Sequence, residues 1–150
     1  MSHSFINCHI HYVFSTKKRQ HLLTPELRER LFPYFGGIAN NNDLKTIAIG
    51  GTDNHVHILA SLAATLPLAK AIQLLKGGSS KWIHDTFPNY QHFAWQEGYG
   101  AFSVSQSQIG NTIQYIQNQA EHHRKMSYEE EFVALLKKHR IEYDERYMWG

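Results

Sequence analysis

Two adjacent segments, residues 43–52 and 54–62, constrain the fold of this chain more than any other part. Each is apolar at alternate positions, and the Gly-Gly-Thr-Asp sequence between them is typical of a turn, so together they predict an antiparallel hairpin. Successive side chains of a strand point to opposite faces of a sheet. His55 and His57 therefore share one face, while Val56 points to the other face and is expected to anchor the core.

The rest of the chain alternates between strand and helix patterns. Period-2 alternation predicts strands over residues 4–16 and 93–105. Helical spacing predicts four helices, the first with Thr24 as its N-cap and Pro25 at its first helical position. The expected helices cover residues 25–41, with a kink at Pro33, residues 66–88, with a break or a close backbone approach at Gly77 and Gly78, and residues 106–126 and 128–140.

This order, β-α-β-β-α-β-α with a helical tail over about residues 127–150, predicts an α+β ferredoxin-like sandwich. We expect an antiparallel four- to five-stranded sheet with helices on one face. A length of 150 residues suits a single domain over residues 1–150. The only cysteine, Cys8, excludes an internal disulfide and a cysteine-based zinc site. With neither a signal-peptide pattern nor a membrane-spanning run, we expect a cytoplasmic protein that does not associate with membranes.

The histidine pair is a candidate metal site. Two neutral imidazoles two residues apart on a strand can bind one divalent ion, but two ligands are too few for a tight site. The alternative is that His55 and His57 are simply polar residues on an open sheet face. A possible third ligand lies in "YIQNQ", where Tyr115 and Gln119 are neighbours on one helical face. Tyr115 is either a nucleophile or a packing residue, and the Gln119 side-chain oxygen is a reasonable ligand for a hard cation.

Taken together, these motifs carry a family resemblance. The chain resembles the single-tyrosine HUH transposases of small bacterial insertion sequences, the IS200-like family, where H-U-H means histidine, a hydrophobic residue and histidine. The H-U-H motif is His55-Val56-His57, and the helix motif Y-I-x-x-Q runs from Tyr115 to Gln119. The stretches "HIHYVFSTKKRQ", "LLKGGSSKWI" and "WQEGYGAFSVS" fit the same family in the same order, so the resemblance extends from about residue 5 to about residue 125.

The resemblance implies an RRM-like, ferredoxin-like fold and a homodimer that acts on single-stranded DNA with hairpins. His55, His57 and Gln119 would hold one Mg²⁺ or Mn²⁺, which polarises the scissile phosphate. Tyr115 would attack the phosphorus, giving a 5′-phosphotyrosine intermediate and a free 3′-hydroxyl. In relatives, the tyrosine helix of one subunit can complete the histidine pair of the other.

Residues that contact DNA are harder to identify, because the net charge is only +2. The basic turn at residues 17–19 and two lysines of the second predicted helix are candidate phosphate contacts, and each is alternatively a solvated surface charge. Three aromatic residues could stack unpaired bases or belong to the core, and the His9–His11 face could meet DNA or be an ordinary polar face. The candidates are Lys17, Lys18, Arg19, Lys76 and Lys81 for phosphates, and Trp95, Tyr99 and Phe102 for bases.

Three other functions remain open. A domesticated relative that processes repeated palindromic sequences is disfavoured, because such relatives tend to follow the tyrosine helix with an Asn-Pro turn that "YIQNQAEHH" lacks. A non-catalytic nucleic-acid-binding module would place aromatic residues at the central sheet positions, where this chain has His55 and His57. An inactive copy is disfavoured by the intact set of histidines, tyrosine and glutamine.

Overall fold

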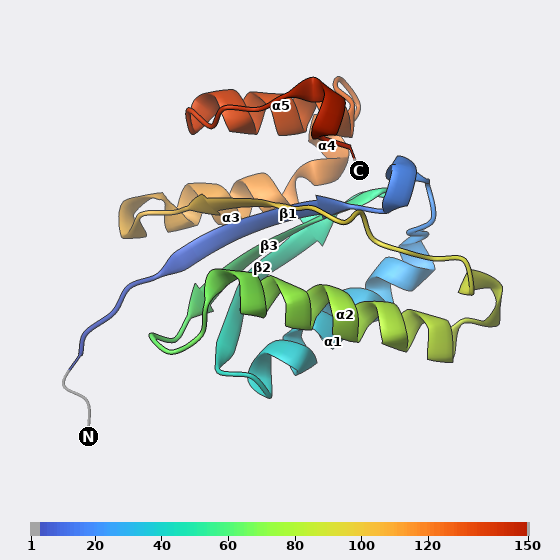
Figure 1. Ribbon diagram of the computed structural model, residues 1–150, viewed down its shortest axis with the longest axis horizontal. Helices are drawn as coiled ribbons and strands as arrows, with labels where there is room; N and C mark the ends of the chain where they lie inside the picture. Colours follow the sequence, from blue (N-terminus) through green and yellow to red (C-terminus); the bar gives the residue numbers. More distant parts are fainter. Residues whose placement is uncertain (1–3, 150) are drawn as a thin grey trace.

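Four antiparallel strands form one sheet in the order β2-β3-β1-β4 (Figure 1). The computed structural model describes residues 4–149, so residues 1–3 and 150 of the predicted domain lie outside it. The hairpin is present and pairs Gly50 with His57. The strands are β1 (His9–Ser15), β2 (Leu44–Gly51), β3 (His55–Leu62) and β4 (Gly100–Ser103).

One face of the sheet is covered by α1 (Pro25–Asn40) and α2 (Leu68–Thr86). The Thr24 hydroxyl accepts a hydrogen bond from the backbone N–H of Leu27 at 3.2 Å, which confirms the predicted N-cap. Side chains that alternate along β1 and β3 form the main core on this face. This core includes Ile10, Tyr12 and Phe14 of β1 and Val56, Ile58, Ala60 and Leu62 of β3.

The opposite face carries a second helical layer, drawn above the sheet in Figure 1. The fold class is confirmed, but the prediction placed helices on one face only. Each amphipathic outer helix has an apolar stripe that must be buried. These stripes pack against the second face of the sheet, so helices cover both faces. They are α3 (Ile109–Gln117), α4 (Gln119–His122) and α5 (Tyr128–Lys138).

The outer layer divides the sheet into two halves. α3 packs through Ile116 against Ala48 and Leu59 of β2 and β3, whereas α5 packs through Phe132 and its neighbours against Val13 of β1. The β3 histidines, which point to this face, lie where the two halves meet. The close approach of α3 requires a glycine at Gly50, because a Cβ there would lie 2.2 Å from the carbonyl oxygen of Ile116.

Several predicted element bounds were wrong. The first strand spans only residues 9–15 rather than 4–16, and the last spans residues 100–103 rather than 93–105, because the antiparallel pairing of β1 with β3 and of β4 with β1 covers only these residues. The predicted helix over residues 106–126 is interrupted at Asn118. α2 runs through Gly78 without a break, and a Cβ at Gly78 would lie 2.9 Å from Ile38 Cδ1, so the predicted close approach is present.

Three-residue 3-10 turns complete the described chain, and the last of them falls in the predicted helical tail. Among the helices of residues 4–149, none has both the length and the apolar character needed to cross a bilayer. The turns are at Lys17–Arg19, Pro88–Tyr90, Gln106–Gln108 and Glu145–Tyr147.

Candidate active site

The two histidines of β3 are fully buried, on the face covered by α3, α4 and α5. Both side chains are 0 % exposed. Val56 between them is also fully buried, but in the core beneath α1 and α2, as the alternation predicted. The pair therefore does not lie on an open sheet face, and its polar atoms must find partners inside the protein.

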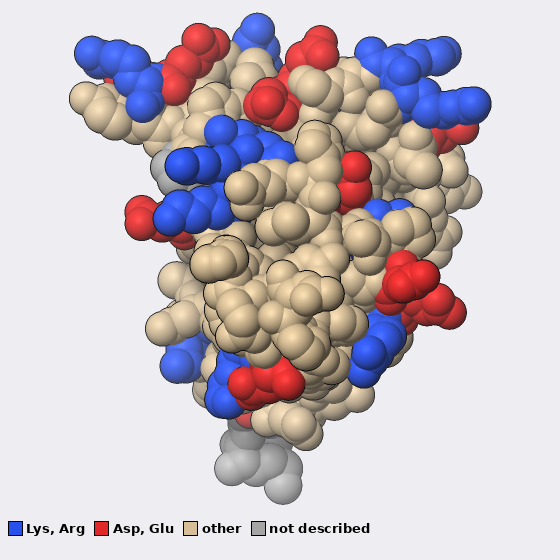
Figure 2. Space-filling model, turned by 90° about the vertical axis from the view of Figure 1, so that its right-hand side faces the viewer, with Lys and Arg blue, Asp and Glu red and all other residues tan. Residues whose placement is uncertain are grey.

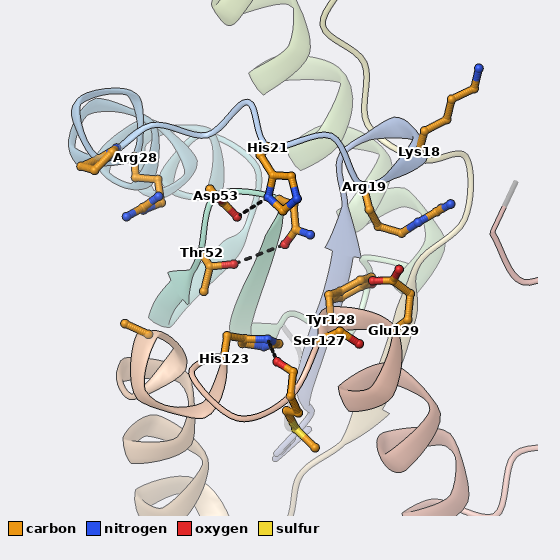
Figure 3. Close-up of a pocket in the computed structure, with 14 residues that line it drawn as sticks. Lys18, Arg19, His21, Arg28, Thr52, Asp53, His123, Ser127, Tyr128 and Glu129 are labelled. Carbon is orange, nitrogen blue, oxygen red and sulfur yellow. Dashed lines mark hydrogen bonds and ion pairs between the residues drawn. The ribbon is translucent and has the colours of Figure 1, made fainter.

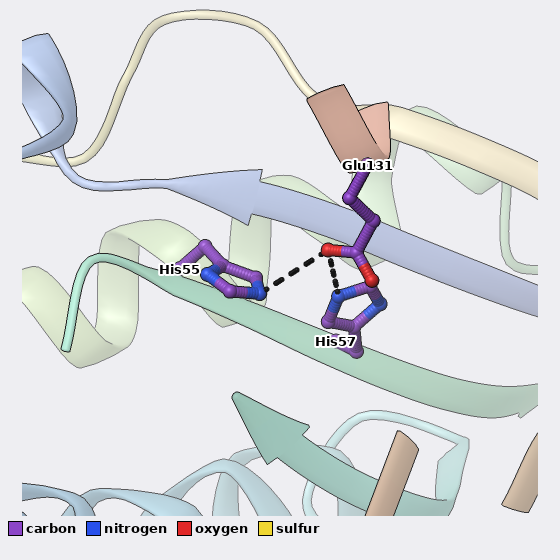
Figure 4. Close-up of side chains that lie close together, drawn as sticks. All are labelled: His55, His57 and Glu131. Carbon is purple, nitrogen blue, oxygen red and sulfur yellow. Dashed lines mark hydrogen bonds and ion pairs between the residues drawn. The ribbon is translucent and has the colours of Figure 1, made fainter. Parts of the chain in front are cut away.

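Glu131 of α5 provides the partner (Figure 4). Its Oε1 atom lies 3.1 Å from His57 Nε2, 3.4 Å from His55 Nε2 and 2.9 Å from His123 Nε2. Glu131 is 1 % exposed, so a single carboxylate oxygen is the meeting point of three imidazoles in a space shielded from water. This convergence joins β3, the end of α4 and α5 into one buried polar cluster.

The second oxygen of Glu131 faces the tyrosine helix. The Tyr115 hydroxyl donates a hydrogen bond to Oε2, and Gln119 Nε2 donates another at 3.1 Å. The Oε1 atom of Gln119 lies 2.8 Å from His55 Nε2. The structure thus brings together the four residues of the two sequence motifs within one chain. These residues, His55, His57, Tyr115 and Gln119, surround Glu131, which neither motif includes.

Outer hydrogen bonds orient both imidazole rings of the pair. His57 Nδ1 lies 2.8 Å from His11 Nε2 on β1, and His55 Nδ1 lies 2.9 Å from Asn54 Oδ1. With protons on their Nε2 atoms both rings donate to Glu131, and a bound cation would favour protons on the Nδ1 atoms instead, where His11 and Asn54 can accept them. Such outer partners are what fixes the tautomer of metal-binding histidines.

Burial and charge set the protonation of this cluster. Burial, with His57 as a neighbour, lowers the pKa of His11 to about 3, and burial lowers the pKa of His57 to about 4 despite the nearby carboxylate. Burial would raise the pKa of Glu131, but hydrogen bonds from His123, His55 and His57 outweigh it and hold that pKa well below its usual range. Glu131 is therefore held as an anion, and against the effect of burial its hydrogen bond and charge raise the pKa of His123.

Tyr115 experiences the opposite effect. Burial raises the pKa of its phenol, and the charge of Glu131 raises it further. The Tyr115 oxygen is therefore held as a hydroxyl that donates to Glu131, and it needs a proton acceptor before it can act as a nucleophile.

The cluster suits a divalent cation. One nitrogen of each of His55 and His57 and a carboxylate oxygen of Glu131 lie within 4.8 Å of one another. His55 Nε2 lies 2.8 Å from Gln119 Oε1 and 3.4 Å from Glu131 Oε1, so a cation that replaced the Nε2 proton would have one nitrogen and two oxygen atoms around it. Imidazole and oxygen ligands of this kind bind several divalent metals, so the set does not identify one ion.

The candidate DNA contacts are spread over the molecule, and three of them have protein partners. The Arg19 guanidinium donates a hydrogen bond to the Trp149 carbonyl oxygen at 3.1 Å. The Lys76 ammonium lies 2.5, 3.3 and 2.9 Å from the carbonyl oxygens of residues 96, 97 and 98. The Lys81 ammonium pairs with Asp85 at 2.7 Å on the surface. Lys76 therefore stabilises the chain before β4 rather than offering a free charge, and Lys81 is a partly neutralised surface cation.

The basic turn borders a cavity of about 730 Å³ next to the histidine cluster (Figure 3). Lys18, Arg19 and Arg28 line it together with the acidic Asp53 and Glu129. Figure 2 shows that basic and acidic side chains are interspersed on this side of the molecule. The positive charge here is therefore local and does not form a broad basic surface.

The remaining sequence candidates are mostly structural. Trp95 and Phe102 are buried, at 8 % and 2 % exposure, and Tyr99 packs against the main core, so none of the three offers a free ring for base stacking. His11 is buried beside His57 rather than on an outer surface. His123, which directly follows α4, has a largely buried side chain that is bonded to Glu131.

Glu131 is the site residue that sequence reasoning missed. It belongs to the buried stripe of α5, between Tyr128, Phe132 and Leu135. A carboxylate on the apolar face of an amphipathic helix is unusual, because Glu is almost never fully buried unless it is paired. A glutamate within an apolar stripe was therefore the sequence signal for a buried, paired carboxylate. The sequence did not identify the partners of this carboxylate.

Known proteins resemble this chain in sequence and in fold. The chain matches a family model described as "Transposase IS200 like" over residues 4–119, and no match was found among curated proteins. A structure of a candidate transposase from Deinococcus radiodurans R1 is 25 % identical, with a TM-score of 0.66 over 79 % of this chain and 95 % of that one. A REP-associated tyrosine transposase bound to a REP hairpin shares the fold, with 12 % identity and a TM-score of 0.57 over 77 % of this chain and 68 % of that one.

The family match covers β1 through Gln119, and therefore includes His55, His57 and Tyr115 but not Glu131. It extends over well more than half of the chain. The protein belongs to the IS200-like transposase family.

Proposed function

We propose that this transposase cleaves and rejoins single-stranded DNA with hairpins through a 5′-phosphotyrosine intermediate on Tyr115. The observation that carries the proposal is the meeting of the Tyr115 hydroxyl, two imidazole Nε2 atoms and the Gln119 side chain at one buried carboxylate. A nucleophile and a set of metal ligands within one hydrogen-bonded cluster are what strand cleavage by a tyrosine requires.

His55, His57 and Gln119, with Glu131 as an additional ligand, would hold Mg²⁺ or Mn²⁺. Such an ion would supply Lewis-acid polarisation of the scissile phosphate. With an ion bound, His11 and Asn54 would accept protons from the two Nδ1 atoms, which would leave the Nε2 lone pairs of the histidines free for the ion. The metal set would then combine imidazole nitrogen with amide and carboxylate oxygen.

Tyr115 provides the attacking oxygen. As its oxygen bonds to phosphorus, its proton must leave, and Glu131 Oε2 is the atom that already accepts that hydrogen bond. The bond from phosphorus to the 3′-oxygen breaks, and that oxygen takes up a proton to become a hydroxyl. Attack by a 3′-hydroxyl on the phosphotyrosine then reverses these transfers and rejoins a strand.

Lys17, Lys18 and Arg19 remain our proposed phosphate contacts, because they form one basic turn, of which Lys18 and Arg19 line the cavity next to the cluster. The fold relative bound to a hairpin supports a hairpin as the DNA partner. A homodimer is part of the proposal, although the geometry described above needs only one chain to bring Tyr115 to the histidines.

The test is to incubate the protein with single-stranded hairpin oligonucleotides and Mg²⁺ or Mn²⁺ and to separate covalent adducts on a denaturing gel. The wild-type protein should form an adduct, which Tyr115→Phe should abolish. His57→Ala should lose cleavage and keep hairpin binding. An adduct that persists in Tyr115→Phe would refute the mechanism, and joint loss of binding and cleavage in His57→Ala would indicate a folding role instead.

A further inference from the structure

A second cavity, of about 620 Å³, opens beside Tyr115 at the His57 end of the cluster. Tyr115 and His11 form part of its wall, and His11 is the residue hydrogen-bonded to His57. Because the histidines and Glu131 are buried, this cavity is a route by which a ligand outside the protein can approach the tyrosine oxygen. Its walls come from the β4–α3 connection, from α3 and from the end of α5.

The lining of this cavity suits a nucleic-acid backbone. It presents hydroxyl groups, side-chain amides and one lysine, and no carboxylate is among its lining residues. The cavity beside the basic turn differs, because Asp53 and Glu129 line it together with its cations. The hydroxyl, amide and ammonium groups of this lining belong to Ser103, Ser105, Gln108, Asn111, Thr112 and Lys138.

Lys138 is the charged group of this cavity. It ends α5, its side chain is exposed, and within residues 4–149 it takes part in no ion pair. An unpaired ammonium beside hydroxyl and amide groups is complementary to a phosphodiester.

We propose that this cavity receives the single strand next to the scissile phosphate, and that Lys138 of the C-terminal helix contacts a backbone phosphate of that strand. The proposal rests on the function proposed above and adds to it the path of the substrate. Lys138 lies outside residues 4–119, so the C-terminal helix contributes to strand binding in a way that the family match does not cover. The hydroxyl and amide groups of the β4–α3 connection face the same strand from the opposite wall.

The first test compares Lys138→Ala with Lys137→Ala, an exposed neighbour on the same helix turn that does not line the cavity. The probe is an unstructured single-stranded oligonucleotide, and the measurement is its Kd at several salt concentrations. Lys138→Ala should weaken binding roughly tenfold and reduce the slope of log K against log salt by about 0.7, the value for one contact with a single strand. Lys137→Ala should change neither quantity.

The second test fills the cavity without removing a charge. Asn111→Trp places a large ring at an exposed position of the cavity wall, and Gln117→Trp does the same on α3 away from the cavity. Asn111→Trp should lower the rate of adduct formation on Tyr115 at least tenfold, whereas Gln117→Trp should not. Both should unfold at the wild-type temperature, which excludes a general loss of structure.

Equal strand affinity and equal salt dependence for Lys138→Ala and Lys137→Ala would overturn the proposal, as would a wild-type adduct rate in Asn111→Trp. A change in the monomer–dimer equilibrium of Lys138→Ala without a change in strand binding would also overturn it, in favour of a contact between two chains. Failure of the wild-type protein to form any adduct would refute the proposed chemistry instead, and strand binding would still decide the role of Lys138.

Discussion

The hydroxyl of Tyr115 donates its hydrogen bond to Glu131, so the tyrosine of α3 is held by a residue that α5 contributes from outside the region shared with the family. The same carboxylate contacts His55 and His57 through its other oxygen. Glu131 therefore connects the nucleophile to the histidine pair, and its replacement should affect both.

Glu131→Gln preserves the shape of the side chain and removes its negative charge. We expect at least a tenfold loss of Mn²⁺ affinity, because the variant lacks the anionic ligand of the cluster. Titration with Mn²⁺, followed by the rise in unfolding temperature that a bound ion produces, measures this loss. Glu129→Gln, an exposed position on the same helix, is the control. Equal Mn²⁺ affinity in Glu131→Gln and wild type would show that the carboxylate is not a ligand.

His11→Phe removes the ring nitrogen that lies next to His57 Nδ1 and keeps an aromatic ring in its place. We expect metal affinity to fall by about 10- to 100-fold, the usual effect of losing an outer hydrogen bond to a ligand histidine. The comparison is His9→Phe, on the same strand and face but without a contact to His57 among the described residues. If both variants bind metal like the wild type, His11 does not orient His57.

Gly50→Ala tests the packing that brings Tyr115 to the histidines. The added Cβ would lie 2.2 Å from the carbonyl oxygen of Ile116, so α3 would have to move away from the sheet. We expect a loss of about 1–3 kcal/mol in the free energy of unfolding and a slower formation of the Tyr115 adduct. Denaturant unfolding measures the first quantity and single-turnover gel assays the second.

Gly77→Ala is the matched variant, because a Cβ at Gly77 would have no atom within 4 Å and the residue lies inside a helix. It should gain about 0.5–1 kcal/mol of stability from its helix propensity. Destabilisation by Gly77→Ala, or no effect of Gly50→Ala, would contradict the packing described here.

Lys76→Met separates a structural lysine from a DNA contact. Loss of the three carbonyl contacts of the Lys76 ammonium should lower the free energy of unfolding by about 1–3 kcal/mol. Hairpin affinity, measured below the unfolding transition, should stay at the wild-type value. Lys81→Ala removes only an exposed ion pair and should change stability by less than about 1 kcal/mol. A large drop in hairpin affinity for Lys76→Met would restore its role as a phosphate contact.

The sequence was sufficient for the features that depend on local periodicity. The alternation through Val56 predicted both the core position of this residue and the common face of His55 and His57. The cap at Thr24 and the succession of strands and helices along the chain also depend on short-range patterns, and both are confirmed.

Features that depend on contacts between distant segments could not be predicted in this way. The spacing of Tyr115 and Gln119 does not reveal the helix break at Asn118. The two side chains meet at Glu131, and Gln119 Nε2 also donates to the Tyr115 carbonyl oxygen at 3.3 Å. The role of Glu131 is set by the docking of α5 on the sheet, and the stripe of apolar residues around it predicts only that the helix packs against something.

The register of β3 decides whether this protein has an active centre at all. A shift of one residue would turn both imidazoles into the apolar core under α1 and α2 and leave a single valine facing Tyr115. The alignment that prevents this is set by ordinary core packing of Val56, Ile58 and Ala60. Core packing and the proposed catalysis therefore depend on alternate residues of the same strand. A core mutation in β3 can abolish activity without changing any of the proposed catalytic residues.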